Sequence, residues 1–462
     1  MSEPRFAVVG HPNKGKSSIV ATLSCDDSVR IGDMPGTTAH CRSFPMAIDG
    51  KACYELVDTP GFQRARRVLQ WLREHETSAA EHPAVVRQFV AEFATSGKYP
   101  DECELLKPLL EGAAILYVVD GSVPYSSEYE AEMEILRWSG QPSMALINPI
   151  RESTHIESWE TALGQFFRVV RVFNPMTAVF AKRVDLLETF GQLHEPWRAS
   201  LKDAVTALHA DREERMERSG TLIATMIADM LTLTAEEKLA PDREATDGDR
   251  EALEERYRGK LRRLEQDTRR AVQQLYHHHS LERQDEEFKM LAEDLFSEST
   301  WNRFGLDRAT LFKTGTMGGA ATGGAIDVAV GGASFLVGSL IGAAVGGGLA
   351  WFAGNKLAKL KVLNIPLGGR KLVYGPMSNE NFPFVVMGRA RLHHRVVAGR
   401  PHARRDELML GEEPELSLSS EARKALAGMF QALRKDNDAT MAMREIACEL
   451  RSLISGDCEE AS

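Results

Sequence analysis

The sequence has few of the features that crosslink or export a chain. Its 462 residues include six cysteines, and no two of them form a CxxC pair. This spacing argues against a zinc knuckle and against a disulfide framework, so we expect a reducing compartment that faces the cytosol. No long apolar stretch follows a basic start at the N-terminus, and we therefore expect no signal peptide.

Excess charge is modest overall but unevenly distributed. The chain is 43% hydrophobic and 26% charged, with a net charge of −10, which is ordinary for a globular protein of about three domains. Residues 201–300 carry 16 basic and 24 acidic side chains, whereas residues 356–405 carry 11 basic side chains and one acid. A protein with this net negative charge is not expected to bind DNA non-specifically. We expect the basic stretch to face an anionic surface.

Residues 1–190 alternate between apolar runs and helical stretches, and we predict one domain there. Short apolar runs at 6–9, 54–57, 113–119, 144–147 and 167–173 are typical of buried strands. Asp49-Gly50 predicts a two-residue hairpin turn. The pattern indicates an α/β fold with a mostly parallel sheet, helices on both of its faces and one antiparallel hairpin at an edge.

The strongest motif follows the first predicted strand. Residues 10–17 read GHPNKGKS and match GxxxxGK[ST], with a strand before the motif and a helix after it. Backbone N–H groups of such a loop point at phosphate oxygens, and the helix start adds a positive dipole end. Lys16 can reach the outer phosphates and Ser17 can hold magnesium. The predicted nucleotide-binding residues of this segment are Gly10, His11, Pro12, Asn13, Lys14, Gly15, Lys16, Ser17 and Ser18.

Two further segments extend the predicted site. Asp58-Thr-Pro-Gly61 follows the run 54–57, so the Asp58 carboxylate can hold magnesium through water and the Gly61 N–H can meet a third phosphate. Met34–Thr38 predicts a turn with two hydroxyls, which could close over the metal and open again after hydrolysis. Of the two, Thr38 fits a PGxT pattern better than Thr37, and we predict it as a magnesium ligand. Lys16, Thr38 and Gly61 are the predicted catalytic groups.

These motifs resemble the P-loop GTPases of the translation-factor-related class, in particular the Era-like and TrmE-like branch. The resemblance covers roughly residues 5–180 and implies GTP and GDP as ligands, magnesium, slow hydrolysis and a two-state switch. It also implies that Asn13 can help hold a potassium ion. Phe62 stands where other GTPases have a water-orienting glutamine, so the resemblance names no catalytic base.

The base-reading motif departs from the pattern of this class. Where NKxD is expected, the sequence reads Asn148-Pro-Ile-Arg151, so only Asn148 matches, and we predict it as a nucleotide-binding residue. The missing aspartate would normally accept hydrogen bonds from guanine, and its loss weakens base discrimination. Ala181-Lys182 is a weak candidate for the later SAK-like loop.

Three further regions are predicted after the first domain. Residues 191–305 indicate a charged helical hairpin or stalk, because apolar residues recur at three or four positions from Leu253 to Leu275. Residues 306–355 indicate a glycine-rich helical hairpin. Residues 356–462 indicate a small basic α+β region with C-terminal helices, in which 360–365, 370–374 and 384–391 are predicted strands and 419–455 a helix or a helix pair.

The glycine-rich region leaves two alternatives open. Residues 328–354 hold no ionisable side chain, a length that exceeds the ~20 residues needed to span a bilayer, and lysines follow at once. Glycines spaced four apart equally suit a tight helical hairpin inside a protein core or an oligomer. We expect a cytoplasmic protein, in contact with the inner face of the cell membrane through 315–354 and 356–405 if the segment inserts.

The order of the regions resembles a bacterial GTPase family whose C-terminal domain has no assigned function. We predict a GTP-binding switch that hydrolyses GTP slowly and signals at a membrane or in a homo-oligomer. Two alternatives remain: a nucleotide-binding scaffold with little hydrolysis, and an RNA- or ribosome-associated assembly GTPase. Nucleic acid is the less favoured partner, because few aromatic residues interleave the basic stretch.

Overall fold

The computed structural model divides into two compact units, and each is described by itself. Unit 1 comprises residues 1–213, 399–406 and 462, and unit 2 comprises 214–398 and 407–461. The predicted turn Met34–Thr38 and the predicted glycine-rich hairpin 306–355 lie outside the described residues. The structure describes residues 3–25, 29, 40–48, 50–151, 154–240, 243–278, 294–297, 300, 361–362, 365–366, 370–403, 418–435 and 439–460.

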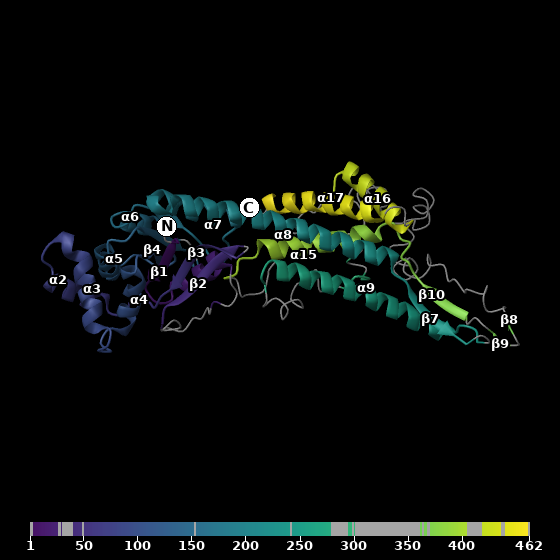
Figure 1. The fold of residues 1–462 in the computed structure, drawn as a ribbon, viewed down its shortest axis with the longest axis horizontal. Helices are drawn as coiled ribbons and strands as arrows, with labels where there is room; N and C mark the ends of the chain where they lie inside the picture. The colour runs from purple at the N-terminus through teal and green to yellow at the C-terminus, as the bar shows by residue number, and fades with distance from the viewer. Residues whose placement is uncertain are drawn as a thin grey trace, which may run out of the picture. The chain divides into compact units, whose positions relative to one another are not determined.

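Unit 1 is built on a six-stranded sheet with the order β2-β3-β1-β4-β5-β6 (Figure 1). Only β2 and β3 pair antiparallel; the other neighbours are parallel. The prediction of a mostly parallel sheet with one hairpin at its edge is therefore confirmed. The strands are β1 (Arg5–Gly10), β2 (Arg42–Ile48), β3 (Lys51–Asp58), β4 (Ala114–Asp120), β5 (Ser143–Asn148) and β6 (Val170–Val172).

Helices cover both faces of this sheet, as predicted. The side chains of β1 alternate, so that Ala7 and Val9 join one core while Phe6 and Val8 join the other. The first core is closed by α2 (Ala65–Glu74), α3 (His82–Phe93), α4 (Pro100–Leu110), α5 (Glu128–Trp138) and α6 (Ile156–Leu163). The second is closed by α1 (Lys16–Ser24), α7 (Phe180–Leu193) and the first part of α8 (Arg198–Thr232), which continues into unit 2. Short 3-10 turns occur at Ala79–Glu81 and Glu195–Trp197.

Unit 2 is mainly helical and contains one strand, β7 (Ala235–Leu239), that the sequence did not reveal. The expected helix over 253–275 is confirmed as α9 (Asp247–Leu275), but β7 lies between α8 and α9 where only a polar turn was expected. It pairs antiparallel with β10 (Arg370–Tyr374), a predicted strand. Two-residue strands β8 (Lys361–Val362) and β9 (Ile365–Pro366) pair with each other, and the C-terminal helix pair is α16 (Ser420–Arg434) and α17 (Ala439–Glu460).

The predicted strand at 384–391 is wrong, because this segment is helical. It belongs to α15 (Phe382–Gly399), whose residues 382–387 are all buried. A helix buried on nearly every side shows no amphipathic period, and its Phe and Val content then resembles that of a strand. At 18 residues, α15 is longer than a typical strand.

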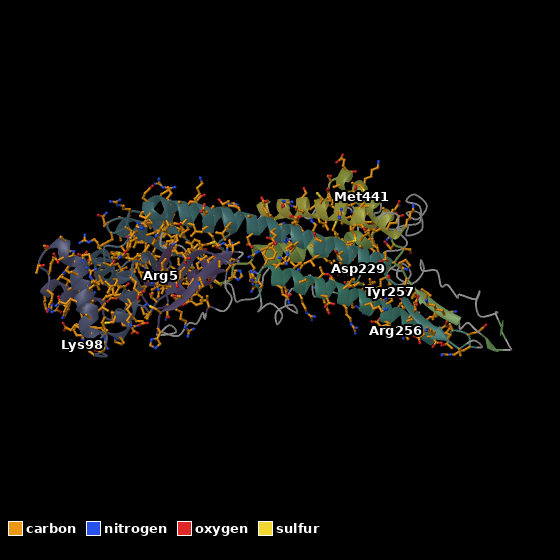
Figure 2. All side chains as sticks on the ribbon, in the orientation of Figure 1. Arg5, Lys98, Asp229, Arg256, Tyr257 and Met441 are labelled. Carbon is orange, nitrogen blue, oxygen red and sulfur yellow. The ribbon has the colours of Figure 1, made fainter. Side chains whose placement is uncertain are left out.

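Figure 2 labels Arg256 and Tyr257, neighbours on α9 with opposite environments. Arg256 is half exposed and its Nη1 lies 2.6 Å from Glu237 Oε2 on β7. Tyr257 is fully buried and packs edge to face against Tyr374 of β10, with ring centroids 5.2 Å apart. An exposed ion pair and a buried aromatic contact thus help to hold the strand pair to α9.

Part of the positive charge of residues 356–405 lies inside the protein rather than on its surface. Arg389, Arg391 and Arg400 are 2%, 3% and 7% exposed. Arg389 Nε lies 2.6 Å from Glu265 Oε1 of α9, within the core of unit 2. These arginines therefore do not contribute to the anionic-surface contact that the charge count predicts.

No helix in the described part of the chain is both long and apolar enough to cross a membrane. The segment 328–354, on which the membrane alternative depends, lies outside those residues.

Two adjacent histidines of α15 make the stability of unit 2 dependent on pH. His394 Nε2 shares a 2.8 Å hydrogen bond with Tyr276 Oη, and His393 Nε2 lies 3.3 Å from Gln273 Nε2. Burial lowers the pKa of His394 to about 3. Burial, together with nearby Arg269, also holds the pKa of His393 well below its usual value. Both rings are neutral in the folded protein.

We expect His394→Gln to flatten the acid limb of the stability curve. Below a pH of about 6.5 the histidine is protonated in the unfolded chain but stays neutral in the folded protein. The free energy of unfolding is therefore highest above that pH and falls as the pH drops below it. Each such histidine makes the free energy of unfolding fall by about 1.4 kcal/mol per pH unit in this range. The variant has one such histidine fewer, so its slope should be smaller by that amount. Urea unfolding across a pH series measures the slope, with exposed His209→Gln as control. Equal slopes in wild type and His394→Gln would contradict the assignment.

Candidate functional site

The loop between β1 and α1 requires glycine at two positions. Gly10 has φ +143° and a Cβ there would lie 2.4 Å from the carbonyl oxygen of Val118. Gly15 has φ +84° and its Cβ would lie 2.2 Å from Nδ2 of Asn148. Both φ values lie in the region that favours glycine, and neither site has room for a side chain. The loop therefore winds tightly against β4 and β5 just before α1 begins.

Lys16 folds back over this loop. Its Nζ donates to the carbonyl oxygens of Gly10 at 3.3 Å and His11 at 3.0 Å, and the residue is 7% exposed. Burial lowers the pKa of Lys16 to about 8, against the opposing charges of Asp58 and Glu132. The ammonium group thus remains mostly charged at neutral pH. It lies against the backbone of the loop, where an anion would bind.

Ser17 and Asp58 meet at the first turn of α1. Ser17 Oγ donates to Asp58 Oδ2 over 2.8 Å. Parallel pairing of β1 with β3 places Asp58 opposite Val8, next to the start of the loop. Thr59 fixes the chain beyond this point, since its Oγ1 donates to the Val8 carbonyl over 2.7 Å. The sheet therefore brings together two side-chain oxygens that lie far apart in the sequence.

Gly61 contacts the loop directly. A Cβ on Gly61 would lie 2.6 Å from the backbone nitrogen of Pro12, and the N–H of Phe62 donates to the Gly10 carbonyl over 3.3 Å. The Phe62 side chain is 1% exposed and belongs to the core under α2 to α6. The position after DTPG thus anchors the segment in the core and presents no polar group to the loop.

Asn148 connects the end of β5 to the same loop. Its Nδ2 donates to the carbonyl oxygen of Lys14 over 3.1 Å, and Lys14 Nζ lies 3.4 Å from Asp120 Oδ2 at the end of β4. Beyond Asn148 the chain exposes Ile150 and Arg151. Of the predicted base-reading residues, Asn148 therefore lies against the loop, and no carboxylate occupies position 151.

The remaining predicted residues are more scattered. Asn13 is exposed and has φ +59°, and Ser18 is half-buried on α1. Thr37 and Thr38 lie outside the described residues. The weak SAK-like candidate Ala181-Lys182 lies within the first turn of α7, whereas the loop that follows β6 comprises residues 173–179.

A buried carboxylate beside the loop escaped the sequence analysis. Glu132 of α5 is 2% exposed; its Oε1 lies 2.8 Å from Nδ1 of His11 and its Oε2 accepts from the Tyr117 hydroxyl over 3.0 Å. Burial and this carboxylate raise the pKa of Tyr117 well above its usual value. Glu132 belongs to a helix with four other acidic or basic residues, so no local pattern marks it as the buried one.

The donor set suits a hard cation better than a soft one. The described residues contain no group of three or more His, Cys, Asp or Glu side chains that could cage a metal. Magnesium, however, is usually held by one or two protein oxygens, with waters and phosphates completing its shell. Ser17 and Asp58 offer oxygens at such a place, with the Lys16 ammonium nearby.

The parallel sheet, the GxxxxGKS loop on its first strand and Asp58 on the adjacent strand define a P-loop GTPase. A family model described as "50S ribosome-binding GTPase" matches residues 5–148. A second model, described as "Domain of unknown function (DUF3482)", matches residues 160–451. Because that match covers more than half of the chain, the chain belongs to the DUF3482 family and carries its GTP-binding GTPase domain ahead of the DUF3482 region.

Similar curated proteins match the GTPase domain alone. "GTPase Der" of Azoarcus sp. is 45% identical over 67 residues, which are 14% of this chain and 15% of that protein. "GTPase Der" of Acidithiobacillus ferrooxidans is 32% identical over 148 residues, 29% of this chain and 32% of that protein. The chain thus spans less than a third of the length of either relative. A crystal structure of Era in complex with MgGDPNP and 16S ribosomal RNA is 15% identical, covers 54% of this chain and 75% of its own, and has a TM-score of 0.28, too low to support an argument.

We expect Gly61→Ala to destabilise unit 1, because its Cβ would collide with the backbone of Pro12. Overpacking of this kind typically costs 1–3 kcal/mol, that is, about 2 kcal/mol of unfolding free energy. Gly259→Ala is the matched control: no atom lies within 4 Å of its Cβ, and alanine in the interior of α9 should stabilise by about 0.5–1 kcal/mol. Urea unfolding of both variants measures the difference, and a neutral Gly61→Ala would contradict the close contact.

Proposed function

We propose that the protein is a GTP-driven molecular switch that binds GTP with magnesium and hydrolyses it slowly. The observation that carries the proposal is the 2.8 Å contact between Ser17 Oγ and Asp58 Oδ2, directly beside the buried Lys16 ammonium. In this arrangement Lys16 binds the outer phosphates, while Ser17 and Asp58 hold the metal. Magnesium, when bound, neutralises charge on the phosphates.

The loop supports triphosphate binding through its backbone. Residues 11–15 form the loop ahead of α1, which begins at Lys16, and N–H groups of such a loop and of a helix start can bind phosphate oxygens; within 11–17, Pro12 alone lacks an N–H. Gly61, held against Pro12, offers its N–H at the side of the loop where a third phosphate would lie. Thr38 remains our proposed second hydroxyl ligand of magnesium.

Slow hydrolysis is supported by the burial of Phe62. Its side chain is 1% exposed, so this position cannot orient an attacking water. Asn13 is exposed on the loop, which leaves its side chain accessible to a potassium ion in the proposed role. The same burial of Phe62 supports the alternative of a nucleotide-binding scaffold with little turnover.

Guanine contacts are the least specified part of the proposal. The side-chain amide of Asn148 donates a hydrogen bond to the Lys14 carbonyl oxygen, and in this way it positions the loop. Position 151 is an arginine, which donates hydrogen bonds and cannot accept the two that guanine offers to an aspartate. We therefore propose that GTP is preferred over ITP and XTP by a smaller margin than an NKxD motif would give.

We expect Lys16→Ala to weaken nucleotide binding and to abolish turnover. Loss of the ammonium removes a charge-assisted contact to phosphate that is worth about 1.5–3 kcal/mol, enough to weaken binding by at least about tenfold. Fluorescent GDP titration and phosphate release, with potassium and with sodium, are the measurements. Lys202→Ala, an exposed lysine on α8, is the control and should behave as wild type. Equal rates in wild type and Lys16→Ala would overturn the enzyme assignment, and tight binding without turnover would select the scaffold.

The partner of the switch is a separate proposal. The name of the family model that matches residues 5–148 supports a ribosomal partner, whereas the glycine-rich segment 306–355 supports a membrane or an oligomer. Burial of Arg389, Arg391 and Arg400 removes three cations from the surface available to any anionic partner. That burial weighs equally against a charge-held contact with ribosomal RNA and with a membrane, so our choice of ribosome association rests on the description of the family model.

Co-sedimentation separates these partners. We expect the protein loaded with a non-hydrolysable GTP analogue to pellet with ribosomes, and to pellet less when loaded with GDP, because a switch presents its partner surface in one state. Anionic liposomes are the parallel sample, and a high-salt wash tests whether a contact depends on charge. Pelleting with liposomes that resists salt, with none on ribosomes, would contradict this choice and favour insertion.

A further inference from the structure

The chain between β3 and β4 contains more helix than the connection requires. A crossover between parallel strands needs a single helix, which α2 would supply. The structure adds α3 and α4 before β4 begins. These helices contribute buried side chains to the core that also holds Phe62. One of them, α4, contacts two segments near Asp58. The first lies just after Asp58 in the chain, and the second leads into β2, the strand that pairs with Asp58.

The first contact is made by Glu102 of α4. Its side chain is 1% exposed, and Oε1 accepts the backbone N–H groups of Gln63 at 3.0 Å and Arg64 at 2.5 Å. These two residues directly follow Phe62, and α2 begins one residue later. The Arg64 guanidinium also donates to the carbonyl oxygen of Lys98 over 2.6 Å, and Lys98 is one of the residues labelled in Figure 2. A buried carboxylate is costly without partners, so these amides fix where Glu102 and the segment meet.

The second contact is made by Glu104, two residues further along α4. Its Oε1 accepts the backbone N–H of Cys41 over 3.2 Å, and its carbonyl oxygen accepts the Cys41 thiol over 3.1 Å. Burial and Glu104 raise the pKa of Cys41 to about 12, so the sulfur keeps its proton. Lys107 Nζ holds the other carboxylate oxygen of Glu104 at 2.6 Å. The residue after Cys41 opens β2 and pairs with Asp58.

The segment between Asp58 and α2 is therefore held from two sides. On one side Gly61 is pressed against Pro12 and the Phe62 N–H bonds to Gly10. On the other side Glu102 binds the next two amides. A displacement of Gly61 away from the loop would have to break the hydrogen bonds to Glu102 or move α4 with it.

We propose that Glu102 is a positioning residue of the nucleotide site, holding Gly61 where its N–H meets the third phosphate. The inference rests on the proposed function, since it assigns that N–H to the triphosphate. Glu104 ties the same helix to the strand that pairs with Asp58. Because the diphosphate lacks the third phosphate, loss of Glu102 weakens binding of the triphosphate more than binding of the diphosphate.

The test compares affinities for GDP and a non-hydrolysable GTP analogue, with magnesium, in the full chain. Glu102→Ala removes both hydrogen bonds, and it should weaken binding of the analogue by about tenfold but of GDP by less than about threefold. Glu102→Gln keeps an acceptor oxygen but loses the charge, so it should shift the ratio of the two affinities in the same direction by less than Glu102→Ala does. Glu92→Ala, an exposed glutamate on α3, is the control and should leave both affinities unchanged.

Circular dichroism verifies that each variant folds. If Glu102→Ala does not fold, Glu102→Gln carries the test, and the ratio of the two affinities should shift by about twofold because the oxygen has lost its charge. An unchanged ratio in the folded variants, or an equal loss for both nucleotides, overturns the inference alone. Wild-type protein that binds neither nucleotide overturns the proposed function and the inference with it.

Discussion

The site depends on the parallel pairing of β1 with β3. This pairing sets Asp58 beside the start of the GxxxxGKS loop, so that its carboxylate accepts the Ser17 hydroxyl over 2.8 Å. A shift of one residue in register would turn the Asp58 side chain to the opposite face of the sheet. The glycines at 10 and 15 then allow the loop to close against β4 and β5, where no side chain would fit.

Three buried acids surround this arrangement and have different tasks. Asp58 contacts Ser17, Glu132 meets His11 and Tyr117 beneath the loop, and Glu102 binds backbone amides at the start of α2. Buried carboxylates are retained when hydrogen bonds offset the cost of removing them from water. Each therefore holds a different stretch of chain near the loop.

The sequence predicted the parts of the protein whose signals are local. The loop 10–17, the hairpin across Gly50 and helix α9 all follow from spacing and turn residues close together in the chain, and the mostly parallel sheet follows from its apolar runs. β7 was missed because five residues of mixed polarity form a strand only against β10, which lies 130 residues away. The strand predicted at 384–391 proved to be part of α15, since full burial removes the amphipathic period. Glu102 and Glu132 carry no mark in the sequence, because their burial is decided by packing between distant elements.

The central claim is that the first sixty residues bind a nucleoside triphosphate through Lys16, Ser17 and Asp58. Isothermal titration of the intact protein with GTP, once in magnesium and once in excess chelator, tests it most directly. The account predicts saturable heat with magnesium and a much weaker interaction without it, because Ser17 and Asp58 then have no ion to share with the phosphates. Absence of heat from GTP at millimolar concentration with magnesium present would contradict it.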